Sequence, residues 1–256
     1  GPGYMRINSD AVSSPNFGAS TTGYQIIKWV TDASGDGYMG SSNDYILFRA
    51  AEVYLNYAEA KAELGTLTQD DLKISIKKIR DRVGMPALDM TAANNNPDPL
   101  MASYYPNVNS GANKGVILEI RRERTVELPC EGLRQWDMLR WKEGAQLVPS
   151  SNGLDGFLGC YFPSLGEYDM NGDGKMDLCL WSGTKPATTC DAMLEIGEGK
   201  DAQLTEGTSG YIVCFRGRTY KWEEGRDYLW PIPTDQRVAT GGALSQNPGY
   251  EDGLSF

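Results

Sequence analysis

The sequence contains no histidine, and this absence excludes several kinds of functional site at once. A Ser-His-Asp triad and a Cys-His pair both use an imidazole as the general base, so neither can be present. Metal sites built on imidazole ligands are excluded for the same reason. Chemistry carried by carboxylates, and metals bound through oxygen atoms, remain open.

Cysteine is scarce, and its five positions form no Cys-x-x-Cys pair: Cys130, Cys160, Cys179, Cys190 and Cys214. Zinc sites and thioredoxin-type redox sites are usually built on such pairs, so both are disfavoured. The odd number leaves disulfides open without implying them. We expect most of these thiols to be buried and unpaired.

Long apolar runs and an excess of positive charge are also missing. No run approaches the ~20 residues that a membrane-spanning helix requires. Asp and Glu (34) outnumber Lys and Arg (24), which gives the 256-residue chain a formal net charge of −10. Such a surface repels phosphate backbones and argues against nucleic-acid binding. The chain does hold 30 glycines and 13 prolines, which predict long ordered loops.

Apolar residues recur at helical spacing in two places, and each place predicts a helical hairpin. The first hairpin covers about 46–84. Its first helix, about 46–64, has an apolar face made of Ile46, Ala50, Val53, Tyr57, Ala60 and Leu64, widened by Leu47, Ala51, Tyr54 and Ala58. Its second helix starts at a capping box formed by Thr68 and Asp71. The stripe of this second helix consists of Leu72, Ile76, Ile79 and Val83.

The second predicted hairpin covers about 115–143, with helices at about 115–128 and 131–143. The polar segment 87–112 is expected to form a loop between the hairpins. Such hairpins are the unit of tetratricopeptide-like stacks, although the full repeat consensus is not met. From about Pro149 on, glycines, aromatics and short β-prone runs predict loops and a few short strands packed on the helices. We therefore expect one mainly α-helical region over 1–256 with long irregular loops.

Oxygen-bearing side chains are spaced closely between Asp169 and Asp177. Side-chain oxygens occur at positions 1, 3, 5 and 9 of this segment, and a glycine occupies position 6. Calcium takes about six to eight oxygen ligands, and this spacing wraps them around one point. We predict a structural calcium site in which Lys175 contributes its carbonyl oxygen and side-chain oxygens come from Asp169, Asn171, Asp173 and Asp177. A glycine-rich turn without metal is the alternative.

Glutamates and arginines crowd together along the predicted helix 115–128. Glu119 and Glu127 could be taken as the acid/base pair of a glycosidase. Glu123 and several arginines lie within a helical turn of them, and neighbouring guanidinium groups lower carboxylate pKa values. A general acid needs the opposite shift. We therefore expect a structural ion-pair network, here and around Glu59, and no catalytic residue.

Aromatic residues are plentiful and suit sugar binding, since sugar rings pack their apolar C–H faces on exposed aromatic rings. The preferred candidates are Tyr38, near Asp36 and Asn43, and Trp181. Other loop aromatics that could contact sugar are Tyr4, Tyr104, Tyr105, Tyr161 and Trp222. Three tryptophans are expected in the core: Trp136, Trp141 and Trp230.

Four groups of residues, in order, resemble the SusD/RagB family of outer-membrane nutrient-binding lipoproteins. They are Asp44–Lys61, Ile79–Gly84, Glu119–Gly132 running into Arg134–Trp141, and Tyr228–Pro233 with the tail Gln246–Tyr250. The resemblance implies a SusD-like fold of tetratricopeptide-like helical hairpins. It also implies a protein that is lipid-anchored on the outer face of the outer membrane through an N-terminal part missing from this chain. Its partners would be an oligosaccharide or polysaccharide and a SusC-like TonB-dependent transporter.

These observations favour a non-catalytic glycan-binding protein of carbohydrate uptake. A calcium-dependent extracellular glycoside hydrolase is one alternative, and it would need two isolated carboxylates facing a cleft. The other alternative is a structural module that binds the transporter itself or a peptide.

Overall fold

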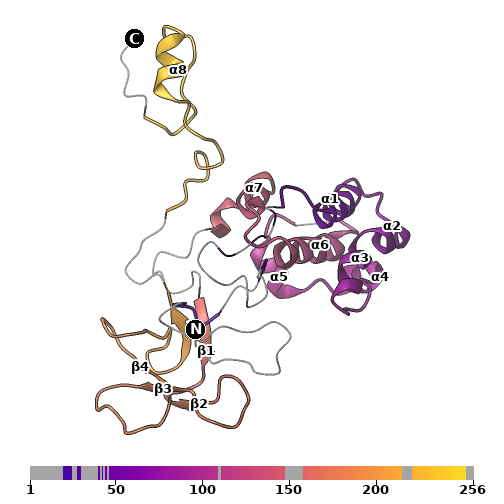
Figure 1. Ribbon diagram of the computed structural model, residues 1–256. Helices are drawn as coiled ribbons and strands as arrows, with labels where there is room; N and C mark the ends of the chain where they lie inside the picture. The colour runs from indigo at the N-terminus through magenta and orange to yellow at the C-terminus, as the bar shows by residue number, and fades with distance from the viewer. Residues whose placement is uncertain are drawn as a thin grey trace. The chain divides into compact units, whose positions relative to one another are not determined.

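Helices dominate the first part of the chain, and short strands follow them (Figure 1). The structure is a computed structural model that describes residues 20–24, 28–29, 40, 42, 44, 46–108, 111–147, 158–214 and 221–251. The chain divides into a helical unit (Ile46–Val148 and Trp222–Phe256) and a strand unit (Gly1–Tyr45 and Pro149–Lys221). The expectation of one family region over 1–256 stays a prediction.

Helices occupy both segments of the helical unit that were predicted to form hairpins. The helices of this unit are α1 (Ala50–Glu63), α2 (Gln69–Ile74), α3 (Ile76–Arg82), α4 (Met90–Asn95), α5 (Pro99–Tyr104), α6 (Lys114–Glu127), α7 (Leu133–Arg140), a 3-10 helix (Gly144–Leu147) and α8 (Thr234–Ala239). None of the helices in the described ranges is both long and apolar enough to span a bilayer. The mainly helical prediction is confirmed, whereas the tetratricopeptide-like arrangement stays a prediction.

Two helix boundaries differ from the sequence prediction for local reasons. Helix α1 starts at Ala50, later than expected, because Arg49 is extended (φ −145°, ψ 152°). The second helix of the first hairpin is split at Ser75, whose backbone leaves the helical region (φ −121°, ψ −93°). The buried Ser75 hydroxyl donates to the Asp71 carbonyl oxygen at 2.6 Å, a bond that competes with the helical ladder. The predicted Thr68–Asp71 capping box is confirmed.

The segment 87–112, expected to be a loop, contains the two short helices α4 and α5, so that prediction was wrong. Asp89 caps α4 by accepting from the Ala92 N–H at 2.9 Å. Asp98 caps α5 by accepting from the Leu100 N–H at 2.8 Å, and a proline occupies the first turn of that helix. The aspartates and prolines that suggested a loop are therefore helix-start signals.

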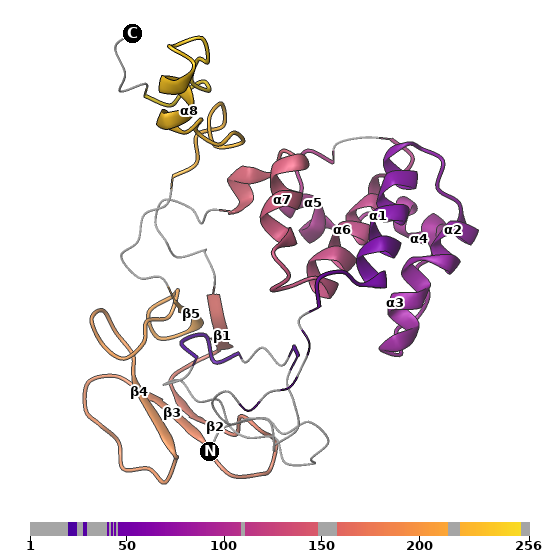
Figure 2. The same ribbon diagram turned by 45° about the horizontal axis from the view of Figure 1, so that its top comes forward.

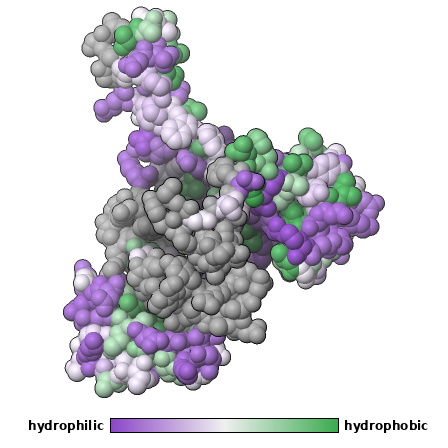
Figure 3. Space-filling view, in the orientation of Figure 1, coloured by the Kyte–Doolittle hydropathy of each residue, from purple (hydrophilic) through white to green (hydrophobic). Residues whose placement is uncertain are grey.

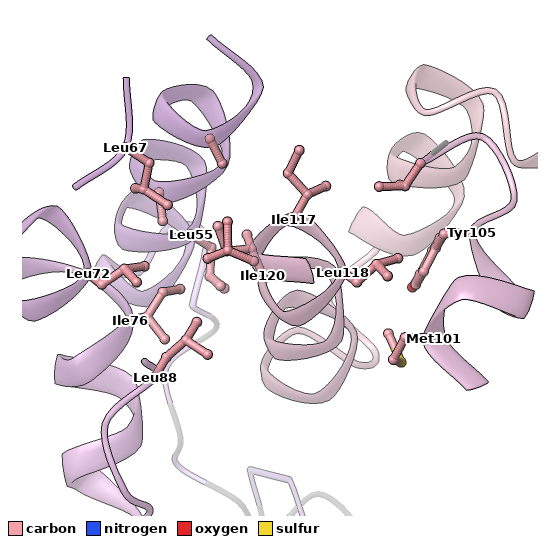
Figure 4. Packing of buried hydrophobic residues seen from close by; sticks show 14 of the residues in the cluster. Leu55, Leu67, Leu72, Ile76, Leu88, Met101, Tyr105, Ile117, Leu118 and Ile120 are labelled. Atoms are coloured by element: carbon pink, nitrogen blue, oxygen red, sulfur yellow. The ribbon is translucent and has the colours of Figure 1, made fainter. Parts of the chain in front are cut away.

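Helix α6 lies at the centre of the helical core (Figure 4). On one side Ile120 lies beside Leu55 of α1, and on the other Leu118 points toward Tyr105. These four side chains are at most 1% exposed. Burying large side chains of this kind stabilises a fold by about 1.5–3 kcal/mol each, so the contacts of α6 on both sides contribute to the stability of the helical unit.

The predicted apolar face of α1 is only partly the buried face. The core receives Leu55, Ala58 and Ala62, which lie on the side that was expected to widen the stripe. Val53 and Leu64, which were expected to be buried, are 64% and 76% exposed. Both sides of α1 are apolar, so periodicity alone did not decide which side packs on α6.

The last two family motifs fold against each other in the C-terminal segment 221–251. The Ile232 N–H donates to Oε1 of Gln246 at 2.8 Å, and Nε2 of Gln246 donates to the Ile232 carbonyl oxygen at 3.1 Å. The Tyr250 hydroxyl donates to the Leu229 carbonyl oxygen at 2.7 Å. The Trp-Pro-Ile-Pro segment and the tail are therefore one structural element.

The strand unit contains two small sheets and its own apolar cluster. Strand β3 (Leu178–Trp181) lies between β2 (Gly166–Tyr168, antiparallel) and β4 (Ala192–Glu195, parallel), as Figure 2 shows. Strands β1 (Leu158–Phe162) and β5 (Gly210–Val213) form an antiparallel ribbon. The buried residues of the cluster are Cys160, Phe162, Leu178, Leu180, Ile196, Ala202, Leu204 and Ile212. The expectation of a few short strands is confirmed.

Candidate ligand-binding surfaces

The glutamates of α6 form ion pairs with arginines. Nε of Arg80 donates to Oε1 of Glu123 at 2.7 Å, and both side chains are 9% exposed. Glu127 accepts from Arg49 and, at 2.6 Å, from Arg82. The oxygen atoms of these carboxylates are thus engaged by arginine side chains, whereas the two carboxyl groups of a glycosidase face the scissile bond. The predicted structural network is confirmed.

A second chain of ion pairs joins α1, α6 and α7. Arg124 donates to Asp137, which also accepts from Arg140. Arg140 and the indole N–H of Trp141 both donate to Glu59. Burial alone would raise the pKa of Glu59, but the bonds from Arg140 and Trp141 outweigh it and hold that pKa below its ordinary value. Glu59 is thus a structural anion.

Arg121 lies between two aromatic rings in the helical core. Its guanidinium carbon is 4.4 Å from the ring centroid of Trp141 and 5.3 Å from that of Tyr105. Burial lowers the pKa of Arg121, and burial also raises the pKa of its neighbour Glu143. Tyr105, a candidate sugar contact in the sequence, is 1% exposed. It packs in the core and cannot stack on a ligand.

The predicted calcium segment forms a turn closed by its own side chains. Asp169 accepts from the N–H of Gly172 at 2.7 Å and of Gly174 at 2.8 Å. Both glycines adopt positive φ (77° and 85°), which a side chain would strain. Backbone N–H groups, that of Gly174 foremost, lower the pKa of Asp169. Its carboxylate therefore stays ionised and faces the inside of the turn.

The other predicted ligands follow the same local pattern. Asn171 accepts from the Asp173 N–H, and Asp173 from the Lys175 N–H, each at 2.9 Å. Asp177 is buried and accepts from the Met170 N–H at 2.9 Å, which closes the segment. In the described ranges, no three acidic or cysteine side chains gather closely enough to hold a metal. The calcium site stays a prediction.

The preferred sugar contacts are placed only in part. Tyr38, Asp36 and Asn43 lie outside the described residues. Trp181 is half-buried at the end of β3, where its carbonyl oxygen accepts from the Ile196 N–H at 2.7 Å. Trp181 comes shortly after the calcium segment in the sequence. Among the described residues it has no aromatic partner.

Exposed aromatic and aliphatic residues occur among polar ones on the surface (Figure 3). Trp136 and Trp230, expected in the core, are 58% and 60% exposed, so that expectation was wrong. Trp136 is on the outer side of α7, and Trp230 lies in a segment whose backbone, not its ring, is held by Asn247. Trp141 is buried, as predicted.

Sequence reasoning missed one aromatic partner. Tyr161, regarded as a loop residue, lies on β1 directly opposite Tyr211 of β5. The two ring centroids are 5.0 Å apart and both side chains are exposed. The β-prone run Tyr211–Phe215 was the signal for a strand at Tyr211, whereas the sequence around Tyr161 shows no alternation of apolar and polar residues.

A comparison with family models matches almost the whole chain, and two solved structures resemble it. A model of the SusD family matches residues 3–250. The solved structure of BT4246 is 25% identical over 83% of this chain and 25% of its own, with a TM-score of 0.50. The SusD-like protein BF3747 from Bacteroides fragilis NCTC 9343 is 24% identical over 80% of this chain and 26% of its own, with a TM-score of 0.43. The chain thus spans about a quarter of the length of these structures. No curated protein matches it.

Proposed function

The chain belongs to the SusD family, and from this premise we propose that it is part of a non-catalytic cell-surface protein that binds oligosaccharides for uptake. The family match over 3–250 carries the proposal. In it, the bound glycan is passed to a SusC-like TonB-dependent transporter in the outer membrane. In the same proposal, a lipid anchor holds the protein on the outer face of that membrane.

The ionised groups of the helical unit support binding over catalysis. A glycosidase needs one carboxylic acid that keeps its proton near neutral pH and a second carboxylate across the scissile bond. Glu59, Glu123 and Glu127 are instead each bonded to an arginine. A binding site needs neither group, because stacking and hydrogen bonds suffice.

Calorimetric titration with neutral and acidic oligosaccharides tests the proposal, combined with a reducing-sugar assay on the same samples. We expect heat of binding with at least one glycan and no release of reducing ends. Release of reducing ends would favour the calcium-dependent glycoside hydrolase. A protein that binds no glycan but co-purifies with a transporter barrel would favour the structural or peptide-binding role.

A further inference from the structure

Two exposed tyrosines lie side by side on the outer face of the β1–β5 ribbon. Tyr161 and Tyr211 are opposite each other in the antiparallel register. They are 53% and 44% exposed. Their neighbours Phe162 and Ile212 are 2% and 3% exposed and belong to the apolar cluster of the strand unit. Side chains alternate between the two faces of a strand, so the tyrosines face away from that cluster.

The two rings are inclined to each other and do not form one flat surface. Their centroids are 5.0 Å apart, and their planes meet at 62°. Neither ring is part of the apolar cluster, and neither hydroxyl makes a hydrogen bond within the described ranges. Two ring faces and two free hydroxyl groups are thus available to a ligand.

Polar groups occur in the turn that precedes Tyr211. The turn 205–209 leads directly into β5, and Thr205 Oγ1 accepts from the Tyr211 N–H at 3.1 Å. The Ser209 hydroxyl donates to Oε2 of Glu206 at 3.1 Å on the exposed side of this turn. Hydroxyl and carboxylate groups next to aromatic faces are what a sugar ring requires for its own hydroxyls.

A third phenol lies nearby, held by the segment Ser20–Tyr24. The Cys160 N–H donates to the Thr22 carbonyl oxygen at 2.8 Å, which fixes this segment beside β1. Gly159 permits the close approach, since a Cβ there would lie 2.5 Å from that oxygen. Tyr24 is 59% exposed, and burial, Cys160 and Tyr211 together raise its pKa. Tyr24 thus belongs to a segment that is held beside β1 and keeps its side chain exposed.

The charge of the chain restricts the ligand. With a net charge of −10, the protein repels polyanionic glycans at long range. We propose that Tyr161 and Tyr211 form a stacking subsite for a pyranose ring of a neutral oligosaccharide. This inference rests on the proposed function and assigns one subsite to it.

The test starts with the unaltered protein and a panel of maltoheptaose, cellohexaose, mannohexaose, xylohexaose and polygalacturonate. We expect one of the neutral oligosaccharides to bind and polygalacturonate not to bind. The double variant Tyr161→Thr with Tyr211→Thr keeps β-branched residues on the strands. It should weaken that binding at least about tenfold, whereas Tyr161→Phe with Tyr211→Phe, which keeps the ring faces, should stay within about threefold. Trp136→Thr, at an exposed tryptophan of α7 (58%), is the matched control.

A chemical measurement makes the test independent of variant folding. Tetranitromethane nitrates exposed tyrosines, and mass spectrometry locates the modified residues. The bound oligosaccharide should protect Tyr161 and Tyr211 but not Tyr57 of α1, which is 39% exposed. Equal binding by the threonine variant, or nitration that the glycan does not slow, would overturn the subsite while the proposed function stands. No binding of any glycan by the unaltered protein would overturn both.

Discussion

Arg124 and Asp137 form an ion pair in the interior of the helical unit. Nε of Arg124 donates to Oδ2 of Asp137 at 2.6 Å, and the two side chains are 4% and 5% exposed. Nη1 of Arg124 donates to Oδ1 of Asn56 at 2.6 Å, so one guanidinium ties together α1, α6 and α7. Because the pair is buried, its bonds form only when the three helices are packed in the correct positions.

Removal of one partner should therefore cost much more than loss of a surface pair. Asp137→Ala leaves the guanidinium of Arg124 buried without its anion, and we expect a loss of about 3–5 kcal/mol in the free energy of unfolding. The control is Lys77→Gln, which breaks the exposed Lys77–Asp81 pair and should change it by less than about 1 kcal/mol. Urea denaturation measures both. Similar small losses in the two variants would contradict the prediction.

Gly115 on α6 gives a second prediction, because α4 approaches it with its backbone. A Cβ at Gly115 would overlap the carbonyl group of Ala93 and lie 2.8 Å from the Asn94 nitrogen. Alanine in a helix is ordinarily better than glycine by about 0.5–1 kcal/mol. Here we expect a net loss in the free energy of unfolding, because overpacking a rigid contact costs about 1–3 kcal/mol.

The measurement is the melting temperature of Gly115→Ala compared with Gly225→Ala. Gly225 has nothing within 4 Å of its Cβ position and no positive φ, so its substitution should be neutral. An unchanged melting temperature for Gly115→Ala would mean that α4 does not pack on α6 at this point.

The sequence predicted the elements of this fold better than their faces. Hydrophobic spacing was sufficient to predict helices in the two hairpin segments, and a Thr-Asp capping box marked the start of α2. The buried side of α1 could not be predicted, because Val53 and Leu55 are both apolar and only packing against α6 selects Leu55. The predicted burial of Trp230 was wrong for a similar reason, since backbone bonds to the tail fix its segment and leave its ring exposed.

The candidate site depends even more on contacts between distant residues. Tyr161 was noticed as an aromatic, but its partner Tyr211 comes from the other strand of the ribbon. Local patterns cannot give that register. The turn Asp169–Asp177, by contrast, is built from side chains that bond to neighbouring N–H groups, so its shape was predictable from the sequence.

The pH dependence of stability tests the role of Glu59. Its pKa in the folded protein is lower than the ordinary value of 4.5, so it contributes stability above about pH 4.5 that is lost as the pH falls toward the folded pKa. Glu59→Gln should lower the free energy of unfolding at pH 7 by about 1–3 kcal/mol. It should also make the loss of stability between about pH 5 and pH 3 shallower. Glu198→Gln, at an exposed carboxylate, is the control and should reproduce the parent curve.

Calcium gives the last prediction. Asp169, Asp173 and Asp177 lie within one short segment, and calcium would bind by drawing their oxygen atoms around one point. Calcium that binds only the folded chain raises stability in proportion to the logarithm of its concentration above the dissociation constant. We therefore expect heat on titration with calcium and a melting temperature that rises by several degrees relative to the chelator-treated protein. Asp173→Asn should reduce both effects, and Asp191→Asn, outside the turn, should reduce neither. If chelator and calcium give identical melting curves and no heat appears, the segment is a metal-free turn that Asp169 closes through its own hydrogen bonds.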